Sequence, residues 1–77
     1  MIDVDTRAMG QMLRQARVAQ RLTQDQLECL SGVSQETISL LERGSLQHPR
    51  FLAVMRLARV LDLEPSTFLT FKDFSQA

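Results

Sequence analysis

The sequence predicts a small all-α domain, a compact bundle of five short helices. Its 77 residues allow one domain with a modest core. Apolar residues recur every three or four positions in segments that begin at capping residues, and no segment shows the alternation typical of a strand. The expected domain covers residues 1–77, with a helical core over about residues 6–70 and a C-terminal tail over residues 71–77.

The first helix is expected over residues 6–20. Met9 and Leu13 lie one turn apart on its apolar line. Asp5 or Thr6 is the expected N-terminal cap, because a short oxygen-bearing side chain accepts hydrogen bonds from the free N–H groups of the first turn.

A capping box starts the second helix. Thr23 is followed by Gln26 at the third helical position, so each side chain is expected to bond the other residue's backbone N–H. Leu27 and Leu30 form the predicted apolar stripe, and Gly32 is the predicted end of the helix.

The third helix follows after a connection of about three residues. Ser34 is its predicted cap, Ile38 and Leu41 are predicted to face the core, and Gly44 is predicted to end it. Two short helices that meet at a tight turn containing glycine form a helix-turn-helix, and its second helix can enter the major groove of DNA.

Two further helices complete the prediction. Pro49 is expected in the first turn of the fourth helix, which is apolar on nearly every side between residues 51 and 61. The fifth is expected to open at residues 64–66 and to run to about Thr70.

Charge and composition narrow the function classes. The net charge is zero, but two blocks of four arginines, at residues 7–21 and 43–59, flank four acids at residues 22–42. Arginine suits bidentate phosphate contacts. With one cysteine, Cys29, and one histidine, His48, we expect no disulfide, no zinc site, no cofactor and no catalytic site. The longest apolar run, residues 51–55, is too short to span a membrane, and a cytoplasmic protein is expected.

Three segments resemble the lambdoid phage repressor and Cro family: residues 22–27 (LTQDQL), 32–39 (GVSQETIS) and 41–44 (LERG). The resemblance extends over about residues 9–70. It implies a compact five-helix, lambda-repressor-like domain in which the third helix reads bases, and it implies that pairs of domains bind operators with two half-sites.

The resemblance and the chemistry of the side chains together suggest base-reading roles. Gln35 occupies the position of a family base reader, and its amide can bond adenine at two points. Glu36 can accept from a cytosine amino group, or it is simply an acid that favours the helix dipole. Ser39, Leu40 and Arg43 continue the same face, with Leu40 suited to a thymine methyl group.

The resemblance also implies contacts with the DNA backbone. Gln24 matches a glutamine that contacts a phosphate, and Arg50 matches an arginine that enters the minor groove. The remaining expected backbone contacts come from Ser34, Arg43, Gln47 and His48. A solvated loop residue is the alternative interpretation of His48.

The family pattern further implies an ion pair between Arg17 and Glu42, which would link the first helix to the end of the third. Glu28 stands where such motifs usually keep alanine or glycine, so its carboxylate is expected to reach solvent unless the helix angle differs. Arg7, Arg14 and Arg21 recur every seven residues, a spacing more typical of a solvated helix face than of a phosphate-binding stripe.

The expected function is that of a transcriptional regulator that binds a palindromic operator in double-stranded DNA as a homodimer. It would be a phage repressor, a restriction-modification controller or an antitoxin. The expected dimer contact consists of Leu52, Phe68, Phe71 and Phe74, unless the tail folds onto its own core. The alternative function is a protein-interaction or antitoxin-like module with little DNA binding, which the zero net charge and the acidic middle block favour.

Overall fold

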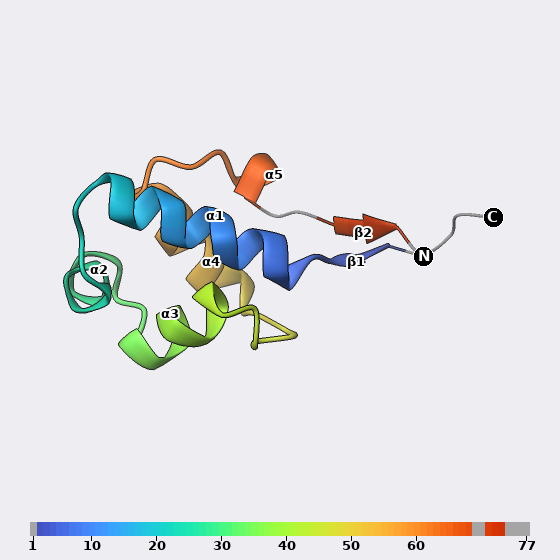
Figure 1. Cartoon of the computed structure of the whole chain (residues 1–77), viewed down its shortest axis with the longest axis horizontal. Coiled ribbons are helices and arrows are strands. Elements are labelled where there is room, and N and C mark those ends of the chain that lie inside the picture. Colours follow the sequence, from blue (N-terminus) through green and yellow to red (C-terminus); the bar gives the residue numbers. More distant parts are fainter. Residues whose placement is uncertain (1, 69–70, 74–77) are drawn as a thin grey trace.

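The computed structural model describes residues 2–68 and 71–73. Figure 1 shows the helices gathered in one body, with a short pair of strands projecting from it. The described elements are β1 (Ile2–Val4), α1 (Thr6–Ala19), α2 (Gln24–Ser31), α3 (Gln35–Glu42), α4 (Phe51–Val60), α5 (Pro65–Phe68) and β2 (Phe71–Asp73). Four of the helices have eight or more residues, and α5 is a single turn.

Side-chain caps begin the first three helices, as predicted. The Asp5 carboxylate accepts a hydrogen bond from the backbone N–H of Ala8, at 3.1 Å, and caps α1. Thr23 and Gln26 form the full capping box of α2, with bonds of 3.0 and 2.9 Å. Ser34 caps α3. These bonds satisfy N–H groups that have no partner within the helix, so the sequence defines where each helix starts.

The turn between α2 and α3 is built around Gly32. Its φ of +76° lies in the left-handed region that glycine adopts without strain, and its N–H donates to the carbonyl of Glu28 at 2.8 Å. Beside it, the buried hydroxyl of Ser31 donates to the carbonyl of Leu27 at 2.7 Å and accepts from the N–H of Val33 at 3.1 Å. The predicted tight turn is confirmed, and Ser31 fixes its geometry from inside.

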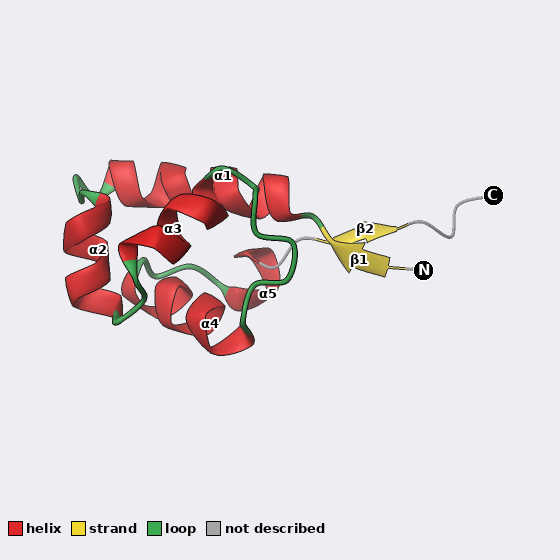
Figure 2. Cartoon of the chain, turned by 90° about the horizontal axis from the view of Figure 1, so that it is seen from below, coloured by secondary structure: helices red, strands yellow, loops and turns green. Residues whose placement is uncertain are grey.

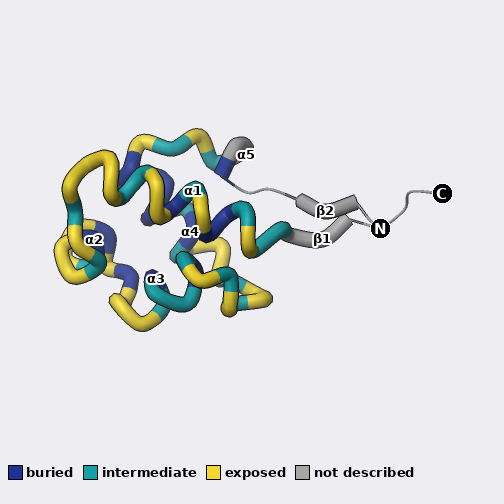
Figure 3. The backbone as a smooth tube through the Cα atoms, in the orientation of Figure 1, coloured by how far each residue is buried: buried dark blue, intermediate teal, exposed yellow. Residues whose placement is uncertain are grey.

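The core lies between α1, α3 and α4, and α2 and α5 close it (Figures 2 and 3). The predicted inward positions Leu27, Ile38 and Leu41 are buried, and so is Val33 in the turn between α2 and α3. Leu30, predicted on the same stripe, is 60% exposed, because the inward line of α2 continues from Leu27 to Ser31. The buried apolar residues are Met9, Leu13, Leu27, Val33, Ile38, Leu41, Val54, Leu57, Ala58, Leu61 and Phe68.

Gly10 marks the closest approach of two helices. A Cβ atom at this position of α1 would lie 2.1 Å from the carbonyl oxygen of Leu41 in α3. Only glycine lets the two backbones approach so closely, since no L side chain fits that distance. The end of α3 is therefore seated directly on α1.

Three predictions about the C-terminal half and the termini need correction. Helix α4 begins at Phe51, with Pro49 outside it and Arg50 as an N-cap residue that makes no side-chain capping bond. The fifth helix is one turn, and Thr70 lies outside the described residues. The all-α prediction holds for the helical body, but β1 and β2 pair antiparallel with Val4 opposite Phe71. Strands of three residues are too short to show an alternating pattern.

Candidate nucleic-acid interface

The outer face of α3 carries the predicted base-reading side chains. Ile38 and Leu41 anchor the helix in the core. The opposite face carries Gln35, Glu36, Ser39, Leu40 and Arg43; the first two and the last are exposed, while Ser39 and Leu40 are half-buried. This face offers an amide, a carboxylate, a hydroxyl and a branched apolar group within one eight-residue helix, and a guanidinium at its C-cap residue Arg43. Such groups match the donors, acceptors and methyl groups of base edges in a major groove.

A bidentate ion pair links α3 to α1. Arg17 Nε lies 2.6 Å from Glu42 Oε2, and Arg17 Nη2 lies 2.9 Å from Glu42 Oε1. The third nitrogen, Nη1, donates to the carbonyl of Leu22 at 2.7 Å. The Glu42 side chain is only 4% exposed. The hydrogen bond to Glu42 raises the pKa of Arg17 above its already high usual value, outweighing the opposite effect of burial.

Glu42 also orients Gln24. The Gln24 amide nitrogen Nε2 donates to Glu42 Oε1 at 3.2 Å. Because an ionised carboxylate only accepts hydrogen bonds, the amide nitrogen, and not its oxygen, faces Glu42. The first residue of α2 is thus tied through one carboxylate to the last residue of α3 and to Arg17 of α1.

A polar depression lies beside α3, next to the ion pair of Arg17 with Glu42. Its volume is about 230 Å³, and its lining is Arg14, Arg17, Gln24, Ser39, Glu42 and Arg43. It therefore joins three predicted DNA-contacting residues to the ion pair and to Arg14.

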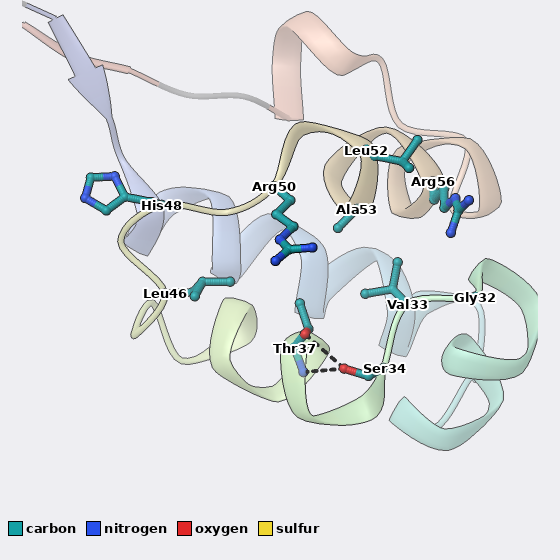
Figure 4. Close-up of a pocket in the computed structure, with 10 residues that line it drawn as sticks. All are labelled: Gly32, Val33, Ser34, Thr37, Leu46, His48, Arg50, Leu52, Ala53 and Arg56. Carbon is teal, nitrogen blue, oxygen red and sulfur yellow. Dashed lines mark hydrogen bonds between the residues drawn. The ribbon is translucent and has the colours of Figure 1, made fainter.

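A second, larger depression lies between α3, α4 and the loop that joins them (Figure 4). Its volume is about 410 Å³. In Figure 4 the guanidinium of Arg50 points into it, toward the first turn of α3, where the Ser34 hydroxyl bonds the Thr37 hydroxyl at 2.9 Å. The lining residues are Gly32, Val33, Ser34, Thr37, Leu46, His48, Arg50, Leu52, Ala53 and Arg56. Gln47 is exposed in the loop and does not line this depression.

Two of the four predicted dimer residues, Leu52 and Phe68, have side chains in the described part of the structure, and these two differ in exposure. Leu52 is 59% exposed on α4, but Phe68 is fully buried, so its assignment to an interface is wrong. Phe68 instead closes the core from α5. Phe71 lies in β2, its side chain is outside the described part of the structure, and so is all of Phe74. Phe51, 69% exposed, is an apolar surface residue that was not among the predicted dimer residues. The signal that could have identified it is its position at the start of the apolar fourth helix, next to Leu52.

A shallow groove of about 530 Å³ begins at Leu52. It follows α4 to the start of α5 and includes Met55, Arg59, Asp62 and Leu63. Its lining is mainly apolar, with two basic residues, Arg56 and Arg59, and one acidic residue, Asp62, a mixture that suits a protein contact.

The carboxylate of Glu28 reaches solvent. Glu28 is half-buried, and in the described part of the chain no buried side-chain nitrogen or oxygen lacks a hydrogen-bond partner. The two helices of the motif therefore accommodate this residue without an unpaired buried charge.

Among residues 2–68 and 71–73, no three His, Cys, Asp or Glu side chains are grouped so that they would hold a metal ion. None of the helices described there has the length and apolarity that a membrane span requires.

Comparison with known proteins places this architecture in a family. A helix-turn-helix family profile matches residues 13–68. An uncharacterized HTH-type transcriptional regulator of Sinorhizobium fredii, y4dL, is 42% identical over 59 residues, which are 77% of this chain and 30% of that protein. RghRB of Bacillus subtilis, another uncharacterized HTH-type transcriptional regulator, is 44% identical over 52 residues, 68% of this chain and 37% of that protein. The chain thus spans about a third of the length of these relatives.

Solved structures share the fold. The restriction-modification controller protein C.AhdI of Aeromonas hydrophila superposes with a TM-score of 0.76 at 34% identity, over 84% of this chain and 97% of that one. SinR, described as the master regulator for biofilm formation and solved in complex with DNA, gives a TM-score of 0.73 at 25% identity, over 78% of this chain and 95% of that one. The helical body and its helix-turn-helix thus have the lambda-repressor-like fold. The chain belongs to the Cro/C1-type helix-turn-helix family of DNA-binding transcriptional regulators.

Proposed function

We propose that this chain binds a palindromic operator as a homodimer and acts as a repressor or controller of transcription. The observation that carries the proposal is the outer face of α3, where five polar or branched side chains stand opposite the core between two arginine-lined depressions. A helix held in this way can lie in a major groove, with its side chains at the base edges and the depressions at the sugar-phosphate backbones.

The base-reading roles follow from the side chains that face outward. Gln35 bonds adenine through both atoms of its amide, and Glu36 accepts from a cytosine amino group. Leu40, half-buried, contacts a thymine methyl group, and Ser39 lies beside it within reach of base or backbone.

Backbone contacts position the domain. Gln24 and Arg43 belong to the smaller depression, while Ser34, His48 and Arg50 belong to the larger one, and Gln47 lies exposed nearby. Arg50 reaches a minor groove, because a narrow groove attracts a guanidinium.

The homodimer forms through the exposed apolar start of α4 and its groove. Phe51 and Leu52 are both more than half exposed and adjacent, and the groove from Leu52 to Leu63 extends the apolar surface. A C2 dimer would place two copies of α3 about one turn of DNA apart. The likeness to the restriction-modification controller protein C.AhdI favours a controller role.

Selection of bound sequences from a random DNA pool tests the proposal. We expect an enriched palindromic motif, and we expect Gln35→Ala to relax the preference at one base pair in each half-site by about 1–3 kcal/mol. Arg50→Ala should instead weaken binding to all sequences and reduce the salt dependence. A pool without enrichment would refute the proposal, and an equal loss on all sequences with Gln35→Ala would refute the role of Gln35.

Sedimentation tests the dimer. Leu52→Asp should give a monomer, because a buried unpaired carboxylate opposes association. Leu30→Asp is the matched control, since Leu30 is 60% exposed on α2, and it should leave the mass unchanged. A dimer that survives Leu52→Asp, or dissociates only with Leu30→Asp, would exclude the α4 surface.

A protein-interaction module is the second candidate. The observation that favours it is the exposed end of α2, where Cys29 and Leu30 stand on the surface beside the half-buried Glu28. The solved complex of SinR with SinI shows a related fold together with a second protein. Failure of the DNA selection, together with tight binding of a protein that is lost with Leu30→Asp, would favour this function.

A further inference from the structure

We propose that Arg14 and Arg56 bind DNA phosphates on opposite sides of α3, so that the helix is held between the two strands that border a major groove. This inference rests on the proposed DNA binding and adds two residues to it. The sequence favours a solvated face over a phosphate-binding stripe for the regular series on α1 to which Arg14 belongs. It assigns no role to Arg56, which lies within α4, one turn beyond its apolar start.

Arg14 lies in the smaller depression together with Gln24 and Arg43. Arg17 lies there too, but its three guanidinium nitrogens already donate to Glu42 and to the carbonyl of Leu22. The charge of Arg17 is therefore balanced by Glu42, and three of its five N–H donors are already engaged. Arg14 and Arg43 are exposed and remain the cations of this depression that can receive a phosphate.

Arg56 lies across the turn of the motif. Its Nη1 would be 3.6 Å from a Cβ atom built on Gly32, so the guanidinium extends from α4 over the connection between α2 and α3. The same side chain lines the larger depression with Arg50 and with Ser34, the cap of α3. In Figure 4 the guanidinium of Arg50, at the N-terminus of α4, points toward the first turn of α3, and that of Arg56 lies over the connection that precedes α3.

The two depressions lie on different flanks of α3. Successive residues of an α-helix are turned by about 100°. Thr37 therefore lies on one flank, and Ser39 and Glu42 lie on the other, with Glu36 and Leu40 on the outer face between them. The cap Ser34 precedes the helix and is hydrogen-bonded to Thr37, so it belongs to the Thr37 side. A helix in the major groove has one sugar-phosphate backbone on each side. Each depression would consequently face a different strand.

The balance of charge supports a phosphate as the ligand. In the described part of the chain the ion pair of Arg17 with Glu42 is the only salt bridge, so the exposed guanidinium groups of Arg14 and Arg56 are not neutralised by a carboxylate. Guanidinium binds phosphate through two parallel hydrogen bonds. These contacts carry no base information, so they strengthen binding to every sequence.

The test uses the full chain and measures dissociation constants for the selected operator and for a scrambled duplex between about 50 and about 200 mM salt. Arg14→Gln and Arg56→Gln should each weaken binding to both duplexes by the same factor. Each should reduce the slope of log K against log salt by about 1 per domain, hence by about 2 for a dimer. Arg21→Gln is the matched control, because Arg21 is exposed between α1 and α2 and lines neither depression, and its slope should not change.

The outcomes distinguish a failure of the proposed DNA binding from a failure of the two arginine contacts. A chain that binds no DNA overturns the proposed function and this inference with it. A chain that binds its operator with unchanged slopes in both variants overturns only this inference, and so does a loss confined to one of the two arginines. The melting temperatures of both variants should equal that of the unchanged chain, because both side chains are exposed.

Discussion

Replacing the partners of the Arg17–Glu42 ion pair singly and together tests whether this pair orients α3 on α1. The perturbation is a double-mutant cycle with Arg17→Met and Glu42→Leu. Glu42→Leu removes the acceptor of two Arg17 bonds and of one Gln24 bond, and it leaves Arg17, whose side chain is 12% exposed, without its carboxylate partner. Breaking a buried pair from one side costs about 3–5 kcal/mol. Since Arg17 retains some access to water, we expect the lower end, about 3 kcal/mol.

Thermal unfolding followed by circular dichroism measures this loss. A change of 1 kcal/mol shifts the melting temperature of a domain this small by about 4–8 °C, so each single variant should melt about 12–24 °C lower. The double variant should lose much less than the sum, because two apolar side chains replace two charges and no partner is left unpaired. Arg14→Met with Glu36→Leu is the control cycle, since both residues are exposed and share no hydrogen bond or ion pair in the described structure. If the losses at Arg17 and Glu42 simply add, the coupling inferred from the geometry is refuted.

Three further predictions concern the body of the domain. Gly10→Ala should lower the free energy of unfolding by about 1–3 kcal/mol in urea denaturation, because its Cβ would meet the carbonyl oxygen of Leu41; a gain from helix propensity would contradict this close contact. Phe68→Ala should lower it by about 3–5 kcal/mol, and a change in oligomeric mass without loss of stability would restore the interface role. Gly32→Ala should cost about 1–2 kcal/mol at its positive φ, and unchanged stability would contradict the need for glycine in this turn.

The helix starts and the motif could be predicted because their causes are local. Thr23 and Gln26 satisfy each other's backbone groups within four residues, and Gly32 can adopt a left-handed conformation at no steric cost. Ile38 and Leu41 then follow the helical period. These features need no knowledge of the rest of the chain, and the residues that face outward on α3 follow from those that face inward.

The errors arise where the outcome depends on a distant partner. Gly10 is defined by the backbone of α3, some thirty positions away in the chain, and nothing near it in the sequence indicates that contact. Phe68 looks like one more aromatic residue near the C-terminus, but the core formed by α1 and α4 leaves a space that it fills. Leu30 lies three residues after Leu27, at a helical spacing, but it is exposed. The buried side of α2 continues from Leu27 to Ser31 instead, so the spacing alone does not identify the buried residue.

In the candidate site, too, some features follow from the local sequence and others depend on contacts between distant segments. The resemblance located Gln24 and Arg50, but only the structure shows that Gln24 shares Glu42 with Arg17 and that Arg50 shares a depression with Arg56. Sequence spacing assigned Arg14 to a solvated face of α1, and it is indeed exposed there. Its neighbours across the depression come from α2 and α3, so its relation to them depends on how three helices pack.

The zero net charge does not oppose DNA binding once the charges are placed. Screening at physiological salt limits the range of an exposed charge's interactions to about 8 Å. A ligand therefore responds to the charges around its own site and not to the net charge of the chain. Glu42 is neutralised by Arg17, and Asp5 caps α1. Arginines line both depressions beside α3, and the one carboxylate in their lining, Glu42, is the paired one. Glu36 lies on the outer face of α3, where DNA phosphates repel its carboxylate. This repulsion weakens binding to every DNA sequence that does not present a base amino group to Glu36. A locally basic surface with one such acid favours selective binding over general binding, and a surplus of positive charge would weaken that distinction.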